Sequence, residues 1–418
     1  MEFYAKAVSV MKAQRPYVQV SITPKGEAAL VKGHPWVYEG EVTAASGEVT
    51  DGELVDVVSR KGSWLGTGFY NSHSKIRIRL ISRNANDKFD EAFWIRRLRY
   101  AWDYRKAVMG KVDSRCCRII FGEADHFPGL TVDRFGDLLS VQILSLGMER
   151  IKDVILTNLV NILREDGQTI RGVFLRNDVA IRELEGMEQG KGWFPLEGKP
   201  LPESTVTEIC ENGVYYSVDV ENGQKTGFFL DQKYNRLAVA KLAKGKRVLD
   251  CFTHTGAFAL NCAKAGAASV TAVDVSELAL AEVQRNAALN GLSVTPLKAD
   301  VFDLLTELTA KKCRDYDYII LDPPAFTKSN ATAKNAFNGY KQINRMAMKL
   351  LPRGGYLATC SCSHFMYEDQ FKRMLLEAAQ EADVSIRFIE QRQQGPDHPI
   401  LPAVPETYYL KFYLLQVL

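Results

Sequence analysis

Residues 246–266, KRVLDCFTHTGAFALNCAKAG, decide the fold class of the carboxyl-terminal half of the chain. The apolar run that ends at Asp250 is typical of a buried strand, and the segment after Gly256 has the length and apolar character of a helix. Strand patterns followed by helical segments then recur as SVTAVDV (269–275), VTPLKAD (294–300), YDYIILDPP (316–324) and GGYLATCSCS (354–363). Alternating strands and helices form a mainly parallel sheet covered on both faces. We therefore predict a Rossmann-like α/β domain over 226–418, with its ligand site beyond the carboxyl ends of the strands.

Carboxylates follow three successive predicted strands, at Asp250, Asp274 and Asp300. A single aspartate in such a place is more often a cap or turn residue, but an ordered series favours a binding site. The first turn has one glycine, Gly256, and lacks the glycine triplet with which dinucleotide-binding turns approach a pyrophosphate. Acids suit ribose hydroxyls and the positive sulfonium and ammonium groups of a methyl donor better than phosphates. The series favours S-adenosylmethionine as the cofactor.

The fourth strand of this domain ends in DPPAF at 322–326. Two prolines fix φ and donate no backbone hydrogen bond, so we expect Pro323 and Pro324 to hold a stiff loop that projects Asp322 and Phe326 into the cleft. Methyltransferases that act on exocyclic amines use a loop of this kind to bind the amino group and stack the base. That activity is one candidate, and a plain strand-ending turn is the structural alternative.

The fifth strand ends in TCSCS at 359–363. Because side chains alternate along a strand, Cys360 and Cys362 point the same way, and the later residue lies nearer the cleft. A thiolate there would add to C6 of a cytosine and make C5 nucleophilic enough to take a methyl group. Asp322 would support this step by hydrogen bonding at N3 and the exocyclic amine. Two small core cysteines are the structural alternative, and strand alternation leaves the choice between the two thiols open.

Residues 18–85 contain five or six short strand patterns separated by turn residues, which predict a small β-barrel. In KIRIRLISR (75–83), the basic residues Lys75, Arg77 and Arg79 share one strand face. The opposite face carries Ile76, Ile78 and Leu80. The basic face is either a solvated outer surface or a surface that contacts RNA phosphates.

We expect residues 1–17 to be an extension and residues 86–225 to form a helix followed by a central α+β domain. The helix runs from Asp87 to about Val112 and has apolar positions at helical spacing. Its basic flank is again a solvated face or an RNA contact, and it consists of Arg96, Arg97, Arg99, Arg105 and Lys106. Two Asn-Gly pairs, at 212–213 and 222–223, indicate hairpins farther along.

Composition narrows the class of protein. The 418 residues suggest two or three domains, and no apolar run reaches the roughly 18 residues that a membrane span needs. The start of the chain lacks the pattern of a secretory signal, so we expect a cytoplasmic protein without a membrane partner. The net charge of +3 is too small to indicate nucleic-acid binding by itself. The eight cysteines form no CxxC pair and no zinc spacing with the six histidines, so we predict reduced thiols and no metal.

Seven motifs together carry a family resemblance: GHPWVYEGEV (33–42), FGEADHFPGLTVDRFGD (121–137), GFFLDQKYNR (227–236), VLDCFTHTGAFAL (248–260), DPPAF (322–326), SCSHFM (361–366) and DHP (397–399). With them the chain resembles, nearly end to end, the RlmI-like class of ribosomal RNA methyltransferases, which carry an amino-terminal PUA domain and make 5-methylcytosine in large-subunit rRNA. The resemblance implies a PUA barrel near 18–83, RNA as the partner, and Cys362 as the nucleophile.

The resemblance also implies which residues bind the donor: Asp250, Phe252, Gly256, Asp274, Asp300 and Asp322, to which we add Thr253. Phe229 and Gln232 of GFFLDQ would flank the donor or the base. Pro323, Pro324 and Phe326 would contact the substrate, as would the barrel cations Lys75, Arg77 and Arg79. The chain departs from the family pattern at Ala325, where relatives often carry lysine, and at His364, where they often carry glycine.

Three functions therefore stand as alternatives. The leading one is a cytosine-5 RNA methyltransferase that uses Cys362. The second is a methyltransferase on guanine or an exocyclic amine that uses DPPAF without a covalent step. The third is a PUA-containing RNA-binding assembly protein whose methyltransferase fold is inactive, against which the intact acids count. His398 is either a base for the C5 proton or a loop residue, and the oligomeric state, a homodimer included, is left open.

Overall fold

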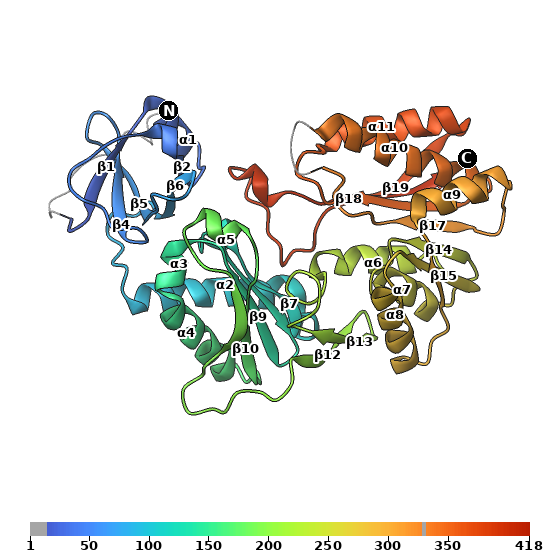
Figure 1. Ribbon diagram of the computed structural model, residues 1–418, viewed down its shortest axis with the longest axis horizontal. Coiled ribbons are helices and arrows are strands. Elements are labelled where there is room, and N and C mark those ends of the chain that lie inside the picture. The colour runs from blue at the N-terminus through green and yellow to red at the C-terminus, as the bar shows by residue number, and fades with distance from the viewer. Residues whose placement is uncertain (1–14, 328–331) are drawn as a thin grey trace. The chain divides into compact units, whose positions relative to one another are not determined.

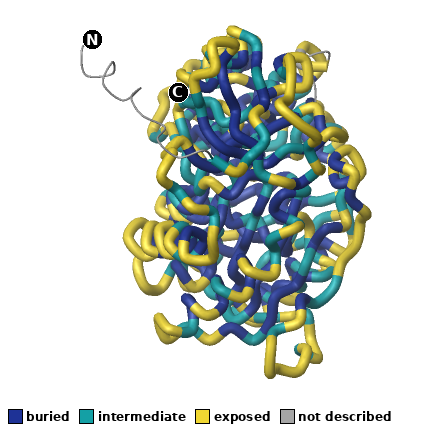
Figure 2. The backbone as a smooth tube through the Cα atoms, turned by 90° about the vertical axis from the view of Figure 1, so that its left-hand side faces the viewer, coloured by how far each residue is buried: buried dark blue, intermediate teal, exposed yellow. Residues whose placement is uncertain are grey.

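The computed structural model describes residues 15–327 and 332–418 and divides into two compact units (Figure 1). The first unit runs through Thr205 and includes the short segments Val220–Thr226 and Ile400–Val404. The second unit contains Val206–Asp219, Gly227–Pro399 and Pro405–Leu418. Buried residues gather in the interior and exposed residues lie on the outer turns and loops of the backbone (Figure 2).

The first unit begins with the predicted barrel-forming strands, which make one six-stranded sheet in the order β2-β6-β5-β4-β1-β3. Thr23 caps the helix α1 (Pro24–Val31), and its side chain accepts a hydrogen bond from the Gly26 N–H. Ile78 and Leu80 are buried in the barrel core, as the alternation in β6 predicted. The strands are β1 (Val18–Ile22), β2 (Trp36–Tyr38), β3 (Val42–Ala45), β4 (Leu54–Val58), β5 (Trp64–Tyr70) and β6 (Ile76–Ser82).

A helix and a five-stranded sheet complete the first unit. The helix α2 (Glu91–Asp113) starts later than the sequence suggested, because the Asp90 carboxylate accepts from the Phe93 N–H and caps the helix there. The sheet has the order β11-β10-β9-β8-β7. Its elements are β7 (Cys116–Phe121), β8 (Leu130–Phe135), β9 (Leu138–Ile143), α3 (Leu146–Arg150), α4 (Lys152–Glu165), β10 (Gly172–Asn177), α5 (Ile181–Leu184) and β11 (Gly190–Phe194).

The hairpin β12 (Val206–Glu211) and β13 (Val214–Asp219) belongs to the second unit, although the sequence grouped it with the central domain. Its backbone docks on the helix α8 (Glu277–Leu289), where the Ser217 N–H donates to Asn286 Oδ1 at 3.0 Å. Glu211, the last residue of β12, forms a buried ion pair with Arg236 of the second unit, with 2.6 Å between Oε1 and Nη1. Contacts made by residues far along the chain therefore decide where the hairpin belongs.

The second unit is the predicted Rossmann-like domain, and its α/β class is confirmed. A seven-stranded sheet has the order β16-β15-β14-β17-β18-β20-β19, in which β20 is antiparallel to both of its neighbours. The chain moves from β14 outward to β16 and then returns to β17 on the other side of β14. In such a sheet, ligands bind at the carboxyl ends of the strands where the order reverses. The site is therefore expected beside the ends of β14 and β17.

Helices cover both faces of this sheet (Figure 1). One face packs against α6, α7 and α8, and the other packs against α9, α10 and α11. The strands are β14 (Arg247–Cys251), β15 (Ser269–Asp274), β16 (Thr295–Lys298), β17 (Tyr318–Leu321), β18 (Tyr356–Ser361), β19 (Ile386–Arg392) and β20 (Lys411–Val417). The helices are α6 (Lys233–Ala240), α7 (Ala257–Lys264), α8 (Glu277–Leu289), α9 (Val301–Ala310), α10 (Ala333–Leu350) and α11 (Glu368–Ala382). None of the helices within residues 15–327 and 332–418 has the length and apolar character needed to cross a membrane.

Candidate active site

Asp250, at the end of β14, is a buried carboxyl group with one satisfied and one unsatisfied oxygen. Its Oδ2 accepts from the Thr253 hydroxyl at 2.6 Å and from the Ala259 N–H at 3.0 Å. In the described part of the chain, its Oδ1 is buried without a hydrogen-bond partner. Burial raises the pKa of Asp250 to about 7, although both hydrogen bonds oppose the shift. An unpaired buried oxygen is costly, so this atom indicates a place for a polar ligand group.

The turn between β14 and α7 has an unusual backbone. Phe252 and His254 have positive φ values of 62° and 52°, which are unfavourable for residues with a side chain. Gly256, with φ of 81°, comes directly before α7, and a Cβ there would lie 3.1 Å from Val283. The hydroxyl oxygen of Thr255 is buried without a partner among the described residues. Strained backbone of this kind is typical of ligand-binding turns.

Asp274 and Asp300 follow the next two strands of the same sheet. The Asp274 carboxylate accepts from the His254 N–H at 2.9 Å and from the Ser276 N–H at 3.0 Å, so it joins the end of β15 to the strained turn. Asp300 is exposed and caps α9, since its Oδ1 accepts from the N–H groups of Phe302 and Asp303. Asp300 thus has the capping role of a single strand-end aspartate, and both bonds use only one of its oxygens.

Asp322, Cys360 and Gln232 form a hydrogen-bonded cluster at the ends of β17 and β18. The Cys360 thiol donates to Asp322 Oδ1 at 2.9 Å. Gln232 Nε2 lies 3.2 Å from the same carboxylate oxygen and 3.4 Å from the Cys360 sulfur. Burial, together with the neighbouring Asp322 carboxylate, raises the pKa of Cys360 well above its ordinary value. Cys360 therefore stays a protonated hydrogen-bond donor and is unsuited to act as the nucleophile.

A chain of side-chain amides fixes the orientation of Gln232. Asn235 Nδ2 donates to Gln232 Oε1 at 2.6 Å, so the Gln232 amino group faces Asp322. Arg392 Nε in turn donates to Asn235 Oδ1 at 3.0 Å. Neither Asn235 nor Arg392 was predicted from the sequence as a site residue. Asn235 lies within the GFFLDQKYNR motif, and that motif was the available signal for it.

Cys362 is half-buried and follows the end of β18. Its neighbours fix the turn on two sides, because the Ser361 hydroxyl donates to the Tyr340 hydroxyl at 3.0 Å and the Ser363 hydroxyl donates to the Thr327 carbonyl at 3.1 Å. The second bond ties the cysteine turn to the segment that follows DPPAF. The structure thus brings together the two motifs that the sequence placed 40 residues apart in the chain.

Phe326 lies in an aromatic cluster of the domain core. Its ring centroid is 4.5 Å from that of Tyr340 and 5.7 Å from that of Phe302, and the ring is half-buried. The same ring centroid lies 6.5 Å from that of Phe252 in the strained turn, so Phe326 lies between that turn and the helices α9 and α10, and its contact with the substrate stays a prediction. Within the same loop, Pro323 is buried and Pro324 is exposed.

Two further predicted positions lie on loops of the second unit. Phe229 precedes α6 and packs edge to face with His254 of the strained turn, with ring centroids 5.2 Å apart. His398 is buried, and its Nδ1 lies 3.0 Å from Asp397 Oδ1. No cluster of three or more histidine, cysteine, aspartate or glutamate side chains suited to a metal ion occurs within the residues that the structure describes.

The barrel cations are largely paired within the first unit. Arg77 is buried and forms an ion pair with Glu39 at 2.7 Å, while Arg79 lies between Glu123 at 3.2 Å and Glu185 at 3.0 Å. The expectation that both arginines stand on an open face therefore needs correction, because neighbouring acids compensate and cover them. Lys75 is the exposed member of the three.

The predicted basic flank of α2 is also mostly compensated. Arg105 is fully buried against Asp125, and Lys106 contacts Asp166 at 2.5 Å. Arg96 and Arg99 pair with other acids of the unit. Arg97 donates to the backbone carbonyls of Ile81 and His126, and burial lowers its pKa to about 10. Most of this flank therefore stabilises the unit internally.

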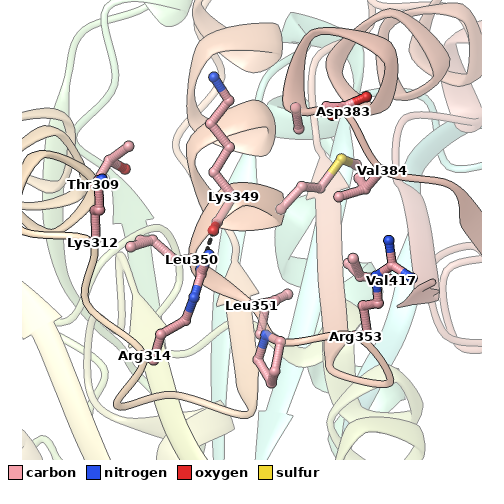
Figure 3. Close-up of a pocket in the computed structure, with 13 residues that line it drawn as sticks. Thr309, Lys312, Arg314, Lys349, Leu350, Leu351, Arg353, Asp383, Val384 and Val417 are labelled. Atoms are coloured by element: carbon pink, nitrogen blue, oxygen red, sulfur yellow. Dashed lines mark hydrogen bonds between the residues drawn. The ribbon is translucent and has the colours of Figure 1, made fainter.

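A cavity of about 480 Å³ lies near the amino ends of β17 and β18, at the opposite ends of these strands from Asp322 and Cys362 (Figure 3). Arg314 and Arg353, which line it, precede β17 and β18, whereas Asp322 and Cys362 follow these strands. The helices α9, α10 and α11 all end at this cavity, and cations are favourable beside the carbonyls of helix carboxyl ends. Figure 3 shows Arg314 donating to the Lys349 carbonyl. None of the predicted site residues lines the cavity.

Family models match two parts of the chain. Residues 20–83 match a PUA-like domain, and residues 190–414 match the S-adenosylmethionine-dependent methyltransferases. The chain is 38% identical over 399 residues to ribosomal RNA large subunit methyltransferase I of Klebsiella pneumoniae (strain 342), which covers 94% of this chain and 96% of the relative. It is 36% identical over 404 residues to the protein of the same name from Escherichia coli (strain SMS-3-5 / SECEC), at 96% and 100% coverage. The chain belongs to this methyltransferase family.

Solved structures agree with the fold of the methyltransferase. A Streptococcus mutans protein described as a SAM-dependent methyltransferase superposes with a TM-score of 0.78 at 23% identity, covering 96% of this chain and 100% of its own. The methyltransferase SMU.776, solved in complex with SAH, superposes with a TM-score of 0.79 at 22% identity and the same coverage. At this level of identity, these neighbours support the fold alone. The predictions of a PUA-like domain and an S-adenosylmethionine-dependent methyltransferase are confirmed.

The residues of the β14–α7 turn fit a bound S-adenosylmethionine. Two buried oxygens, Asp250 Oδ1 and Thr255 Oγ1, lack protein partners in the described part of the chain and are suited to polar groups of a ligand. Asp274 and Asp300 end the adjacent strands on the same edge of the sheet. When bound, the donor supplies an electrophilic methyl group.

Proposed function

We propose that this methyltransferase modifies C5 of a cytosine in large-subunit ribosomal RNA through a covalent adduct between Cys362 and C6. The observation that carries the proposal is the difference in burial and hydrogen bonding between the two thiols. Cys360 is a buried donor to Asp322, while Cys362 is half-buried at the end of the same strand. The names of the relatives, which are 36–38% identical over nearly the whole chain, supply the RNA class.

In this proposal, each residue of the cluster has a defined role in base activation. The Cys362 thiolate forms a bond to C6, and the electrons of the C5–C6 double bond make C5 nucleophilic. C5 takes the methyl group, after which a base removes the C5 proton and the Cys362–C6 bond breaks to restore the aromatic ring. Asp322, whose Oδ1 accepts from Cys360 and Gln232, would in its protonated form donate to N3 as negative charge develops there and accept from the exocyclic amine.

We further propose that donor binding involves the strained turn and the strand-end acids, with Asp250, Phe252, Thr253, Gly256 and Asp274 as its centre. Asp300 takes part through the oxygen that does not cap α9. Phe229 supports the turn through His254. Gln232 acts on Asp322 rather than on the donor, because its amino group faces that carboxylate.

The PUA-like domain, residues 18–85 in our division of the chain, is proposed to bind the RNA substrate. The relatives' names refer to large-subunit ribosomal RNA, which is consistent with this partner. Lys75 is the barrel cation of the predicted set that remains exposed for a phosphate contact, since Arg77 and Arg79 are paired.

The experiment compares Cys362→Ala with Cys360→Ala on ribosomal RNA that carries 5-fluorocytidine, and it measures both product and trapped covalent adduct. We expect Cys362→Ala to lose both. Cys360→Ala should still form the adduct, at a reduced rate because Asp322 loses one of its donors. Near wild-type product from Cys362→Ala would refute the covalent mechanism. A product methylated on guanine or an exocyclic amine would favour the noncovalent alternative.

A further inference from the structure

Lys411, the first residue of β20, is a buried lysine that makes no ion pair with a carboxylate in the described part of the chain. Lys411 is 3% exposed, and its ammonium group donates hydrogen bonds to two backbone carbonyls. The acceptors are Ser363 O at 2.6 Å and Tyr409 O at 2.8 Å. A buried ammonium is costly without a counter-charge. A neighbouring group that becomes negative would therefore stabilise the ammonium form of Lys411.

The register of the sheet places Lys411 beside the cysteine turn. The strands β18 and β20 pair antiparallel, with Ser361 opposite Lys411. Directly opposite residues in such a pair point to the same face, so Lys411 shares the face of Ser361, while Cys362 packs with Cys360 toward the other face. The chain then continues from Ser361 through Cys362 to Ser363, whose carbonyl accepts the lysine hydrogen bond. Lys411 thus holds the turn from the β20 side, while the Ser363 hydroxyl holds it to Thr327 on the other side.

Three titratable groups interact with Lys411, and they come from β18, the turn after it and α11. Burial lowers the pKa of Lys411 to about 8, and the negative forms of Cys362, Cys360 and Glu368 act in the opposite direction. Glu368 already has a cation, Lys372, at 2.9 Å, and accepts from the Tyr408 hydroxyl at 3.0 Å. Cys360 is kept protonated by burial and by Asp322. Cys362 is the remaining group whose negative form Lys411 would compensate.

We propose that Lys411 is a positioning residue that holds the turn from Ser361 to Ser363 and supplies the positive charge against which the Cys362 thiol ionises. The inference rests on the proposed function, because it treats Cys362 as the nucleophile. The coupling between the two groups is mutual: if a thiolate at Cys362 favours the ammonium form of Lys411, that ammonium favours the thiolate to the same extent. Lys411 does not touch the base in this account and acts only through Cys362.

The test measures alkylation of Cys362 by iodoacetamide in the full-length protein from pH 6 to pH 10, with the modified peptide quantified by mass spectrometry. Lys411→Gln keeps an N–H donor for the Ser363 carbonyl but removes the charge, and Lys411→Met removes both. We expect both variants to shift the Cys362 alkylation profile to higher pH, with a rate at pH 7 that is lower by roughly tenfold or more. At pH 10 the rate of Lys411→Gln should approach that of the wild type.

Cys210, a half-buried cysteine of the hairpin, serves as the control in the same digest, and its rate should not change. Thermal unfolding and calorimetric binding of S-adenosylhomocysteine verify that each variant is folded. A Cys362 profile in Lys411→Gln that superposes on the wild type overturns the inference. A rate lowered by the same factor at every pH also overturns it, since only the packing of the turn would then have changed.

This assay needs neither RNA nor donor, so it separates the inference from the proposed function. If Cys362→Ala is inactive but the alkylation profile does not move, the role of Lys411 is refuted while the function stands. If Cys362→Ala still methylates RNA, the function is refuted, and with it the catalytic meaning of any shift.

Discussion

Replacing Asp250 with asparagine removes a buried charge without changing the shape of the side chain. In the folded protein, burial raises the pKa of Asp250 from its ordinary 3.8 to about 7. The unfolded chain therefore releases this proton at a lower pH than the folded chain does. Folding is accordingly most favourable, with respect to this group, below pH 4, and stability is lost as the pH rises toward 7. Ionisation of Asp250 lowers the unfolding free energy by ~4 kcal/mol over the whole pH range, and ~2–3 kcal/mol of this decrease falls between pH 5 and pH 8.

In Asp250→Asn, the side-chain oxygen still accepts from Thr253 and Ala259, but the titration is absent. Urea unfolding at pH 5 and pH 8 should therefore show that the donor-free wild type loses ~2–3 kcal/mol more unfolding free energy over this range than the variant does. A cationic donor favours the ionised carboxylate, so the wild type should bind it more tightly as the pH rises through 7, and the variant should not. The same pH dependence in both proteins would refute the reasoning about Asp250.

Three further expectations follow from other contacts. Glu211→Gln should lower the unfolding free energy by about 3–5 kcal/mol in urea denaturation, because it leaves Arg236 buried without its partner; a change below 1 kcal/mol would contradict this. Gly256→Ala should cost about 1–3 kcal/mol in the same assay and weaken S-adenosylhomocysteine binding in calorimetry, because φ of 81° is unfavourable for alanine; unchanged binding would argue against the turn as donor site. Lys75→Ala should reduce the salt dependence of RNA affinity without changing the melting temperature, whereas Arg77→Ala should lower the melting temperature; the reverse pattern would contradict our assignment.

The order of the elements and the places where strands end were determined by local sequence patterns. The runs that end near Asp250, Asp274 and Asp322 are strands in the structure, and each acid lies within one residue of the end of its strand. Hydrophobic periodicity and turn residues act over a few neighbouring positions, so they can be recognised without tertiary information. The start of α2 was less certain because several polar residues precede it, and the Asp90 cap selected one of them.

Roles that depend on distant partners could be seen only in the structure. Phe326, in the loop after β17, packs against aromatic rings from the helices α9 and α10, and Arg77 is paired with Glu39, which directly follows β2. Asn235 and Arg392 join the site from opposite ends of the second unit's sequence. No local pattern specifies such contacts, because they arise when elements pack together.

The two cysteines of TCSCS show most clearly what the local sequence determines and what only the tertiary structure decides. Strand alternation correctly gave Cys360 and Cys362 the same side of β18, where both pack toward the face covered by α6, α7 and α8. It could not distinguish them, since periodicity specifies the direction of a side chain but not its depth or its neighbours. The structure distinguishes them by placing the Cys360 thiol against Asp322 and the Lys411 ammonium against the turn that carries Cys362. Whether a thiol ionises depends on burial and nearby charges, and in this protein those charges come from strands that lie far apart in the chain.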